Sequence, residues 1–295
     1  MALRFQHHPG LVVYLTAGDA GLSPSSQSSG EGADLSVTRE IALAAIDAGA
    51  DVIELGVPFS DPLGDGPVIQ RASERAIVRG TRLKDVLGLA AELRAARPHA
   101  GLVIFSYLNP ILRYGMPKFA DEASAAGVDG VLLIDMIVEE AGEYLVEMER
   151  VNLAPIFLAA PTSPDDRLQA IAAHSKGFIY AISRTGITGQ QQNVAADAAA
   201  LVARIRRWTG VKDGHQDGPG DDADWRGLPI AVGFGISNAD HVAEVAKFAD
   251  AAVIGSAIVE LIERSTEEQA SGAVARFIEG LFTQGLRQPV EVHAL

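Results

Sequence analysis

The sequence predicts an α/β fold consisting of a single (β/α)8 barrel of the TIM type. Short apolar runs rich in Val, Ile and Leu recur along the chain, and an amphipathic or alanine-rich stretch follows each of them. These runs contain too few polar residues to alternate, which is typical of strands covered on both faces. Eight such units in 295 residues match a closed barrel in number and length. A doubly wound open sheet is the alternative, because the sequence does not show whether the strands form a closed ring.

The expected elements alternate along residues 1–295, which we take as one domain. Strands are expected at Leu11–Thr16, Asp51–Gly56, Leu102–Ser106, Gly130–Ile134, Ala154–Leu158, Phe178–Ser183, Ile230–Gly233 and Ala251–Gly255. Helical periodicity predicts helices at Thr38–Ala48, Leu83–Arg97, Lys118–Ala126, Glu139–Val151, Asp165–His174, Ala195–Trp208 and Ala239–Ala249, and a last helical region at Ala257–Gln284.

Two segments interrupt this alternation and are expected to be insertions. Gly21–Asp34 is rich in Ser and Gly and lengthens the loop after the first strand, at the end of the barrel that carries active sites. Gly210–Gly227 follows a helix and carries five aspartates among glycines. Because the spacing of these aspartates differs from the Asp-x-Asp-x-Asp-Gly pattern of a calcium loop, we expect a solvated loop. Since it follows a helix, it should lie at the end of the barrel opposite the active site.

The composition excludes several classes of function. The formal net charge of -14 argues against a broad nucleic-acid interface and against binding to anionic membranes. The absence of cysteine excludes disulfides, thiolate catalysis and cysteine-ligated metal sites. No apolar run reaches the ~18 residues of a membrane-spanning helix, and the first one reads better as a strand than as a signal peptide. We therefore expect a soluble, cytoplasmic protein.

Glu54 is the strongest candidate for a catalytic residue. Since side chains alternate along a strand, Glu54 should share one face with Val52 and Gly56, while Ile53 and Leu55 pack on the helices. Glu54 then points into the mouth of the barrel, where active sites of this fold lie. A buried carboxylate is costly unless it is paired, so the position favours an acid/base role; a structural Glu bound to a neighbouring loop is the alternative.

Asp61 and Asp65 follow in the next loop, among glycines and prolines. Aspartate in such a setting is commonly a turn former or a helix cap. Because Asp65 lies only eleven residues after Glu54, the two carboxylates can also face one pocket. Two carboxylates in different environments can divide the acid and base roles between them.

A phosphate site is expected after the last two strands. Gly233-Phe-Gly235-Ile-Ser237-Asn238 ends one of them, and Gly255-Ser256 follows the other and begins a helix. Loops at these two positions form the usual phosphate cradle of a barrel, in which backbone N–H groups and a helix N-terminus bind the anion. Gly186-Ile-Thr-Gly189 could add donors as a mobile lid. Tight turns that need glycine are the alternative for either segment alone.

The positions of lysine and histidine disfavour two other aldolase mechanisms. A Schiff-base aldolase needs a lysine inside the barrel mouth, and a zinc aldolase needs clustered histidine ligands there. No lysine and no histidine ends a predicted strand. Proton transfer by carboxylates without a metal remains, with Tyr180 either as a helper or simply as an aromatic residue of the core.

Several of these segments resemble the tryptophan synthase alpha subunit family. The block Glu54-Leu-Gly-Val-Pro-Phe-Ser-Asp-Pro62, with Asp65-Gly-Pro67, is highly specific, whereas the glycine segments are shared with many barrels. The resemblance covers most of the chain. The other matching segments are Tyr14-Leu-Thr-Ala-Gly-Asp19, Tyr107-Leu-Asn-Pro110, Ser183-Arg-Thr-Gly-Ile-Thr-Gly189, Gly233-Phe-Gly-Ile-Ser237 and Gly255-Ser-Ala257.

The resemblance implies a carbon–carbon lyase of tryptophan biosynthesis, which splits indole-3-glycerol phosphate into indole and D-glyceraldehyde 3-phosphate by a retro-aldol reaction. Glu54 would be the acid and base, and Asp65 would stabilise the positive charge that develops at the indole nitrogen. The other residues that it implies are Tyr14, Tyr180, Gly189, Gly233, Gly235, Gly255 and Ser256 for substrate binding, and Asp61, Arg184 and Thr188 for closure of the lid.

The resemblance also implies partners. The chain itself would hold no metal and no cofactor, and indole would pass to a beta subunit that carries pyridoxal phosphate, as an alpha2-beta2 tetramer. Docking would use the loops near Val57–Pro62 and Asn109–Gly115. The sequence departs from the family in three places: about ten residues precede the first strand, where the family usually has a capping helix, Gly64 stands where Ala is common, and Ile137 stands where Asp-x-Pro is common.

Three alternatives stay open on sequence grounds. A different phosphate-binding barrel, such as a sugar-phosphate isomerase or epimerase, would explain the glycines but not the whole block from Glu54 to Pro67. A non-catalytic subunit that only activates a partner would not need Glu54 and Asp65. A free-standing lyase that releases indole would use the same barrel and the same two carboxylates.

Overall fold

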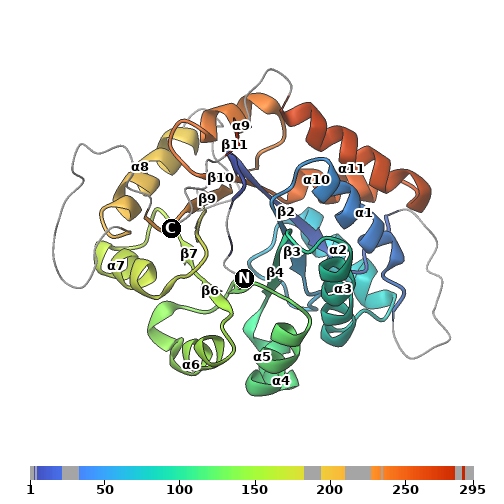
Figure 1. Cartoon of the computed structure of the whole chain (residues 1–295), viewed down its shortest axis with the longest axis horizontal. Coiled ribbons are helices and arrows are strands. Elements are labelled where there is room, and N and C mark those ends of the chain that lie inside the picture. The colour runs from blue at the N-terminus through green and yellow to red at the C-terminus, as the bar shows by residue number, and fades with distance from the viewer. Residues whose placement is uncertain are drawn as a thin grey trace.

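The computed structural model describes residues 3, 5–21, 33–182, 194–209, 227–233, 235–282 and 288–289. Most of both predicted insertions, residues 22–32 and 210–226, lies outside them, so their form stays a prediction. Figure 1 shows helices surrounding a central set of strands.

The strands form a nearly closed parallel barrel. Within the described residues, a nine-stranded sheet runs in the order β6-β5-β4-β3-β2-β10-β9-β8-β7. Its two end strands, β6 and β7, are separated along the chain only by Phe157, so the ends of the sheet meet at one stretch of chain. The doubly wound alternative is therefore wrong, and the predicted barrel is confirmed. The strands are β2 (Gly10–Thr16), β3 (Val52–Gly56), β4 (Gly101–Ser106), β5 (Gly130–Leu133), β6 (Ala154–Ile156), β7 (Leu158–Ala159), β8 (Ile179–Ile182), β9 (Ile230–Gly233) and β10 (Ala251–Ile254).

The helices follow the strands largely as expected. They are α1 (Ser36–Asp47), α2 (Pro67–Val78), α3 (Leu83–Ala96), α4 (Leu108–Tyr114), α5 (Met116–Ala125), the 3-10 turn η1 (Val138–Glu140), α6 (Gly142–Arg150), α7 (Asp165–His174), α8 (Val194–Arg206), α9 (Ala239–Val245), α10 (Ser256–Glu263) and α11 (Glu267–Leu281). A short antiparallel pair, β1 (His7–His8) with β11 (Gln288–Pro289), lies outside the barrel sheet.

Two helices, α2 and α4, were not predicted from the sequence. Gly66 precedes α2 as its N-cap and Pro67 begins it, which is the usual place for a proline. Its buried residues are Ala72, Ser73 and Ala76, so its inner face lacks the large apolar side chains that mark helical periodicity.

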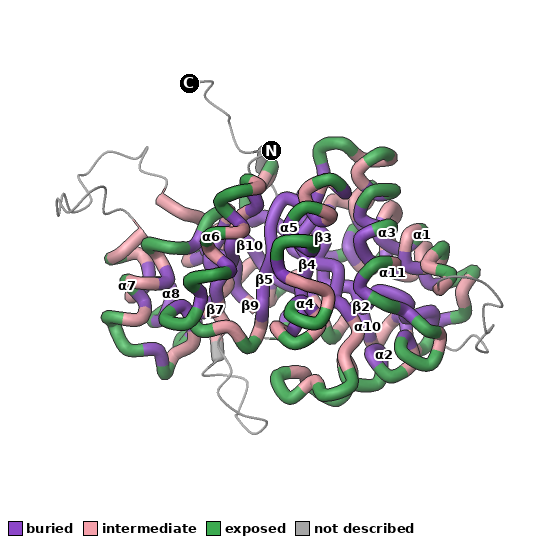
Figure 2. Tube along the Cα trace, turned by 90° about the horizontal axis from the view of Figure 1, so that it is seen from below, coloured by how far each residue is buried: buried purple, intermediate pink, exposed green. Residues whose placement is uncertain are grey.

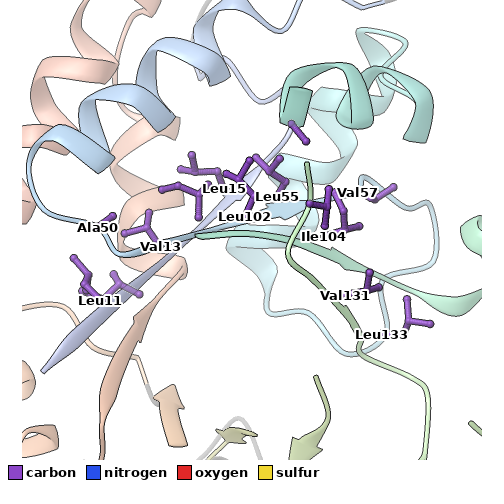
Figure 3. Packing of buried hydrophobic residues seen from close by; sticks show 14 of the residues in the cluster. Leu11, Val13, Leu15, Ala50, Leu55, Val57, Leu102, Ile104, Val131 and Leu133 are labelled. Carbon is purple, nitrogen blue, oxygen red and sulfur yellow. The ribbon is translucent and has the colours of Figure 1, made fainter. Parts of the chain in front are cut away.

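The alternation of side chains along β3 agrees with the prediction. Ile53 and Leu55 are fully buried and belong to the cluster between the strands and the helices, part of which Figure 3 shows. Val52, on the same face as Glu54, belongs to the second cluster, in which residues of the neighbouring strands such as Val12 and Val103 fill the barrel interior. Figure 2 shows this layering: the strands are buried, and the exposed segments lie on the outer helices and loops.

Leu3 closes the amino end of the barrel. Its side chain is buried and belongs to the interior cluster. A Cβ atom added at Gly101, Gly130 or Gly177 would lie 3.0, 2.8 or 2.9 Å from the Leu3 side chain. The three glycines therefore make room for this plug.

Three aspartates fasten neighbouring strands at the same end. Each directly precedes a strand, and its carboxylate accepts the N–H of a residue at the start of the adjacent strand. The pairs are Asp51 with Leu11 (2.8 Å), Asp129 with Leu102 (2.9 Å) and Asp250 with Ile230 (2.8 Å). A buried donor left without its acceptor costs about 1–3 kcal/mol, so these bonds should matter for stability.

Asp129→Ala should lower the free energy of unfolding by about 3 kcal/mol. The Leu102 N–H would lose its acceptor, and the guanidinium of Arg94 would lose the carboxylate with which it pairs. Denaturant unfolding measures the change. The control is Asp121→Ala, which removes an exposed ion pair with Arg150 and should barely move the midpoint. Equal effects of the two variants would contradict the role of Asp129.

Among the described residues, none of the helices has the length and apolar character that spanning a bilayer requires.

Candidate active site

Glu54 lies on β3 inside the barrel, next to Tyr14 of β2 and Val103 of β4 in the register of the sheet. Its side chain is completely buried, and neither carboxylate oxygen has a hydrogen-bond partner among the described residues. Burial disfavours the charged form and raises the pKa of Glu54 to about 8. At neutral pH the group is therefore a carboxylic acid, which can give up a proton.

Asp65 lies in the loop between β3 and α2, and its side chain is partly buried. Burial raises the pKa of Asp65 to about 6, and a hydrogen bond from the Tyr107 hydroxyl opposes that rise. The Tyr107 hydroxyl donates to Asp65 Oδ2 over 3.1 Å. Asp65 thus ionises at a pH at which Glu54 still keeps its proton, so the two carboxyl groups can take different roles.

Tyr14 and Tyr180 each lie close enough to Glu54 and Asp65 to feel the charge of both carboxyl groups. Burial raises the pKa of each phenol, and the charges of Glu54 and Asp65 both raise it further. A Cβ atom at Gly56 would lie 2.3 Å from the Tyr14 hydroxyl, and one at Gly233 would lie 2.9 Å from the Tyr180 hydroxyl. Glycine at the ends of β3 and β9 therefore leaves room for both hydroxyls in the barrel mouth.

An aromatic wall lines the same mouth. The ring of Tyr14 packs edge-on against Phe105 of β4, with centroids 5.1 Å apart. Ile134, after β5, and Leu158 of β7 pack against the same interior cluster. A planar, apolar ligand ring would find van der Waals partners here while its polar atoms meet the carboxyl groups.

The glycines predicted to hold phosphate gather at one edge of the barrel. Gly233 ends β9, Gly255 follows β10 as the N-cap of α10, and these two strands pair in parallel. Gly235 has a φ of 78°, which strongly favours glycine. A Cβ at Gly255 would lie 3.5 Å from the Cβ of Tyr14, so the edge adjoins the side chains beside Glu54. Ser256 begins α10, so the N-terminus of this helix lies at the same edge.

Of the residues predicted for closure of a lid, the structure describes only Asp61. Asp61 is exposed, and the Ser60 hydroxyl donates to its carboxylate over 2.6 Å. Arg184, Thr188 and Gly189 lie outside the described residues, so their predicted contacts stay predictions. Across the described ranges, no three His, Asp or Glu side chains lie close enough together to hold a metal ion.

Tyr107 and Phe105 line the site although no role was predicted for either from the sequence. Phe105 has the same inward parity on β4 as Glu54 has on β3, because the two strands pair Glu54 with Val103. Tyr107 is the first residue after β4, at the end of the barrel where function resides. The signal that could have identified Tyr107 is its position directly after a strand at this end of the barrel.

Comparisons with known proteins agree on one family. The family model described as tryptophan synthase alpha chain matches residues 1–215 and 223–285. The tryptophan synthase alpha chain of Solibacter usitatus is 43% identical over 268 residues, covering 91% of this chain and 89% of its own. That of Geobacter sulfurreducens is 41% identical over 279 residues, covering 95% and 94%.

Solved structures extend the agreement to the fold. A mutant tryptophan synthase alpha-subunit from Pyrococcus furiosus superposes with a TM-score of 0.77 at 32% identity, covering 95% of this chain and 99% of that one. Ligand-free tryptophan synthase from M. tuberculosis gives 0.74 at 30% identity, covering 93% of each chain. The chain belongs to the tryptophan synthase alpha chain family.

Proposed function

We propose that this chain cleaves indole-3-glycerol phosphate to indole and D-glyceraldehyde 3-phosphate, with Glu54 as acid and base and Asp65 as the electrostatic partner of the indole nitrogen. The observation that carries the assignment of residues is the completely buried Glu54 carboxyl, which has no hydrogen-bond partner among the described residues and lies beside Tyr14. An unpaired buried acid is costly for stability, so it is best explained by a ligand that completes its contacts.

The reaction needs one group that gives a proton and takes another back. Glu54, protonated at neutral pH, donates its proton to C3 of the indole ring, which turns the ring into a cation. The resulting carboxylate then takes the proton of the hydroxyl group on the adjacent glycerol carbon. As that O–H bond breaks, the carbonyl of glyceraldehyde 3-phosphate forms, the carbon–carbon bond breaks, and its electron pair restores the neutral indole.

Asp65 stabilises the positive charge that protonation at C3 places on the indole nitrogen. The carboxylate is ionised above about pH 6. In a partly buried site it stabilises a developing cation far better than water would, because it is already oriented and the local dielectric is low. The aromatic wall of Tyr14 and Phe105 would hold the ring between the two carboxyl groups.

The pH profile should follow from these two groups. Cleavage needs Asp65 ionised and Glu54 protonated, so kcat/KM should fall below about pH 6 and above about pH 8, with a maximum between. Initial rates of indole release from pH 4.5 to 9.5 measure the profile. A rate that keeps rising above pH 8.5 would contradict the acid role of Glu54.

The glycine edge should bind the phosphate. Ser256→Asp places a carboxylate at the first residue of α10, where it stabilises the helix but repels the phosphate. KM should rise roughly tenfold or more with a smaller change in kcat. Ser256→Ala, which adds no charge, is the matched control and should change KM much less. An unchanged KM in Ser256→Asp would count against the phosphate site.

Indole formed here would pass to a beta subunit that carries pyridoxal phosphate, as the family implies. Large apolar side chains support docking at the barrel mouth: Leu63, Leu112 and Ile137 are 95%, 53% and 42% exposed. They lie in the segments that follow β3, β4 and β5, which are neighbours in the sheet. Leu112 lies within the predicted docking loop Asn109–Gly115, and Leu63 directly follows the other one, Val57–Pro62. We also place the enzyme in the cytoplasm, with the pathway that it serves.

Indole release by the purified chain from indole-3-glycerol phosphate tests the proposal. Indole should form with the chain alone and faster with a beta subunit. No acceleration on mixing would favour a free-standing lyase, and activity only on sugar phosphates would favour an isomerase or epimerase. No turnover in either case would favour a non-catalytic subunit.

A further inference from the structure

The Tyr107 hydroxyl bridges two consecutive residues of the loop that carries Asp65. Its oxygen accepts the N–H of Gly64 over 2.9 Å, and its O–H donates to Asp65 Oδ2 over 3.1 Å. Tyr107 directly follows β4 and is buried, so the hydroxyl is attached to the rigid barrel. A phenol is suited to this position because one oxygen can both accept and donate.

The loop itself has few other constraints. Leu63 and Gly64 are exposed, and the loop's internal backbone bonds join Leu63 to Asp61 and Asp65 to Pro62. The Gln70 amide donates to the carbonyl of Asp65, which holds the backbone of the loop but not the carboxylate. Among the described residues, Tyr107 is the hydrogen-bond donor to the Asp65 side chain.

Packing around the ring supports the same geometry. Phe59, from the same loop, lies against the Tyr107 ring with centroids 5.0 Å apart. A Cβ atom at Gly64 would lie 3.3 Å from the Tyr107 hydroxyl and 2.9 Å from Ile134 Cδ1. Glycine at this position therefore lets the loop approach the hydroxyl closely.

The chemistry of the bridge fits the proposed role of Asp65. Burial raises the pKa of the Tyr107 phenol, so it stays a donor throughout the working pH range. A donated hydrogen bond favours the ionised form of its acceptor. The other titratable groups whose charges act on this cluster are Glu54 of β3, Tyr14 of β2, Tyr180 of β8 and Asp135 after β5, none of which carries a positive charge.

We infer that Tyr107 is a positioning residue for the cleavage reaction: its hydroxyl fixes the Asp65 carboxylate toward the barrel mouth and keeps it ionised. The inference rests on the proposed function, because it matters only if Asp65 acts on the substrate. Tyr107 works through Asp65 and needs no contact with the reacting atoms.

Tyr107→Phe tests the inference, because it keeps the ring against Phe59 and removes only the bridge. Loss of a hydrogen bond to a charged group should lower kcat/KM roughly 10- to 100-fold. The acid limb of the pH profile should move to higher pH, because Asp65 loses a bond that favours its ionised form, while the alkaline limb stays. The position of a limb does not depend on the fraction of folded enzyme, so this readout separates positioning from stability.

Tyr144→Phe is the matched control. Its hydroxyl donates to the Val131 carbonyl over 2.8 Å on the helix side of β5, and the variant loses a buried phenol oxygen without touching Asp65. It should leave both limbs unchanged. A shift equal to that of Tyr107→Phe would overturn the inference.

A double-mutant cycle with Asp65→Asn separates the positioning role of Tyr107 from the proposed role of Asp65. Tyr107→Phe should have little further effect in the Asp65→Asn background. Equal losses in both backgrounds, or an unmoved acid limb in Tyr107→Phe, would refute the positioning role alone. An Asp65→Asn variant with wild-type kcat would instead refute the proposed role of Asp65.

Discussion

Replacing Glu54 by Gln should abolish indole release while leaving ligand binding intact. The amide keeps the shape of the buried carboxyl but cannot give a proton to C3 of indole or take one from the glycerol hydroxyl. A general acid–base group contributes roughly 10²–10⁴-fold, and Glu54 serves in both steps, so the loss should lie at the upper end. Steady-state assays give kcat, and binding of glyceraldehyde 3-phosphate shows whether the site still accepts its ligand. Turnover within a few-fold of wild type would refute the role.

The free energy of unfolding of the same variant, relative to the wild type, should increase as the pH rises. Burial raises the pKa of Glu54 from the ordinary 4.5 to about 8. Below pH 4.5 Glu54 is neutral in both the folded and the unfolded chain, and the wild type keeps its full free energy of unfolding. As the pH rises through about 8, ionisation of Glu54 stabilises the unfolded chain, so the free energy of unfolding falls. Gln has no proton to lose. Unfolding midpoints of the two proteins should therefore diverge between pH 4.5 and 8.5, whereas parallel curves would contradict the raised pKa.

Asp65→Asn should reduce kcat by roughly 10²–10³, the range seen when one preorganised group that stabilises transition-state charge is removed. The amide cannot supply negative charge to the indole nitrogen, but it preserves the size of the side chain and leaves the phosphate edge untouched. KM should change little. The control is Asp85→Asn, since Asp85 accepts the N–H of Arg82 at the start of α3, outside the barrel mouth. A pure KM effect in Asp65→Asn would make Asp65 a binding residue instead.

The inward position of Glu54 could be predicted from the sequence because it follows from the alternation of side chains along a strand. Once β3 is a strand with Ile53 and Leu55 against the helices, Glu54 must face the interior. The glycine edge was predictable for a similar reason. In a closed parallel barrel the last two strands are neighbours, so Gly233 and Gly255 lie at the same edge of the barrel.

The features that could not be predicted from the sequence depend on contacts between distant segments of the chain. The bridge from Tyr107 to Asp65 spans 42 positions and depends on how closely the loop approaches β4. The break at Phe157 divides one predicted strand into β6 and β7, because one part pairs with β5 and the other with β8. The small inner residues of α2 gave no periodic apolar signal.

The central claim is that Glu54 is held as a neutral acid inside the barrel. Carbon-13 NMR of protein labelled at the glutamate carboxyl carbons measures it directly, with the Glu54→Gln spectrum identifying the resonance. We expect one carboxyl resonance that is absent from the variant and titrates with a midpoint near pH 8. A Glu54 resonance that titrates near pH 4.5, like an exposed glutamate, would contradict it.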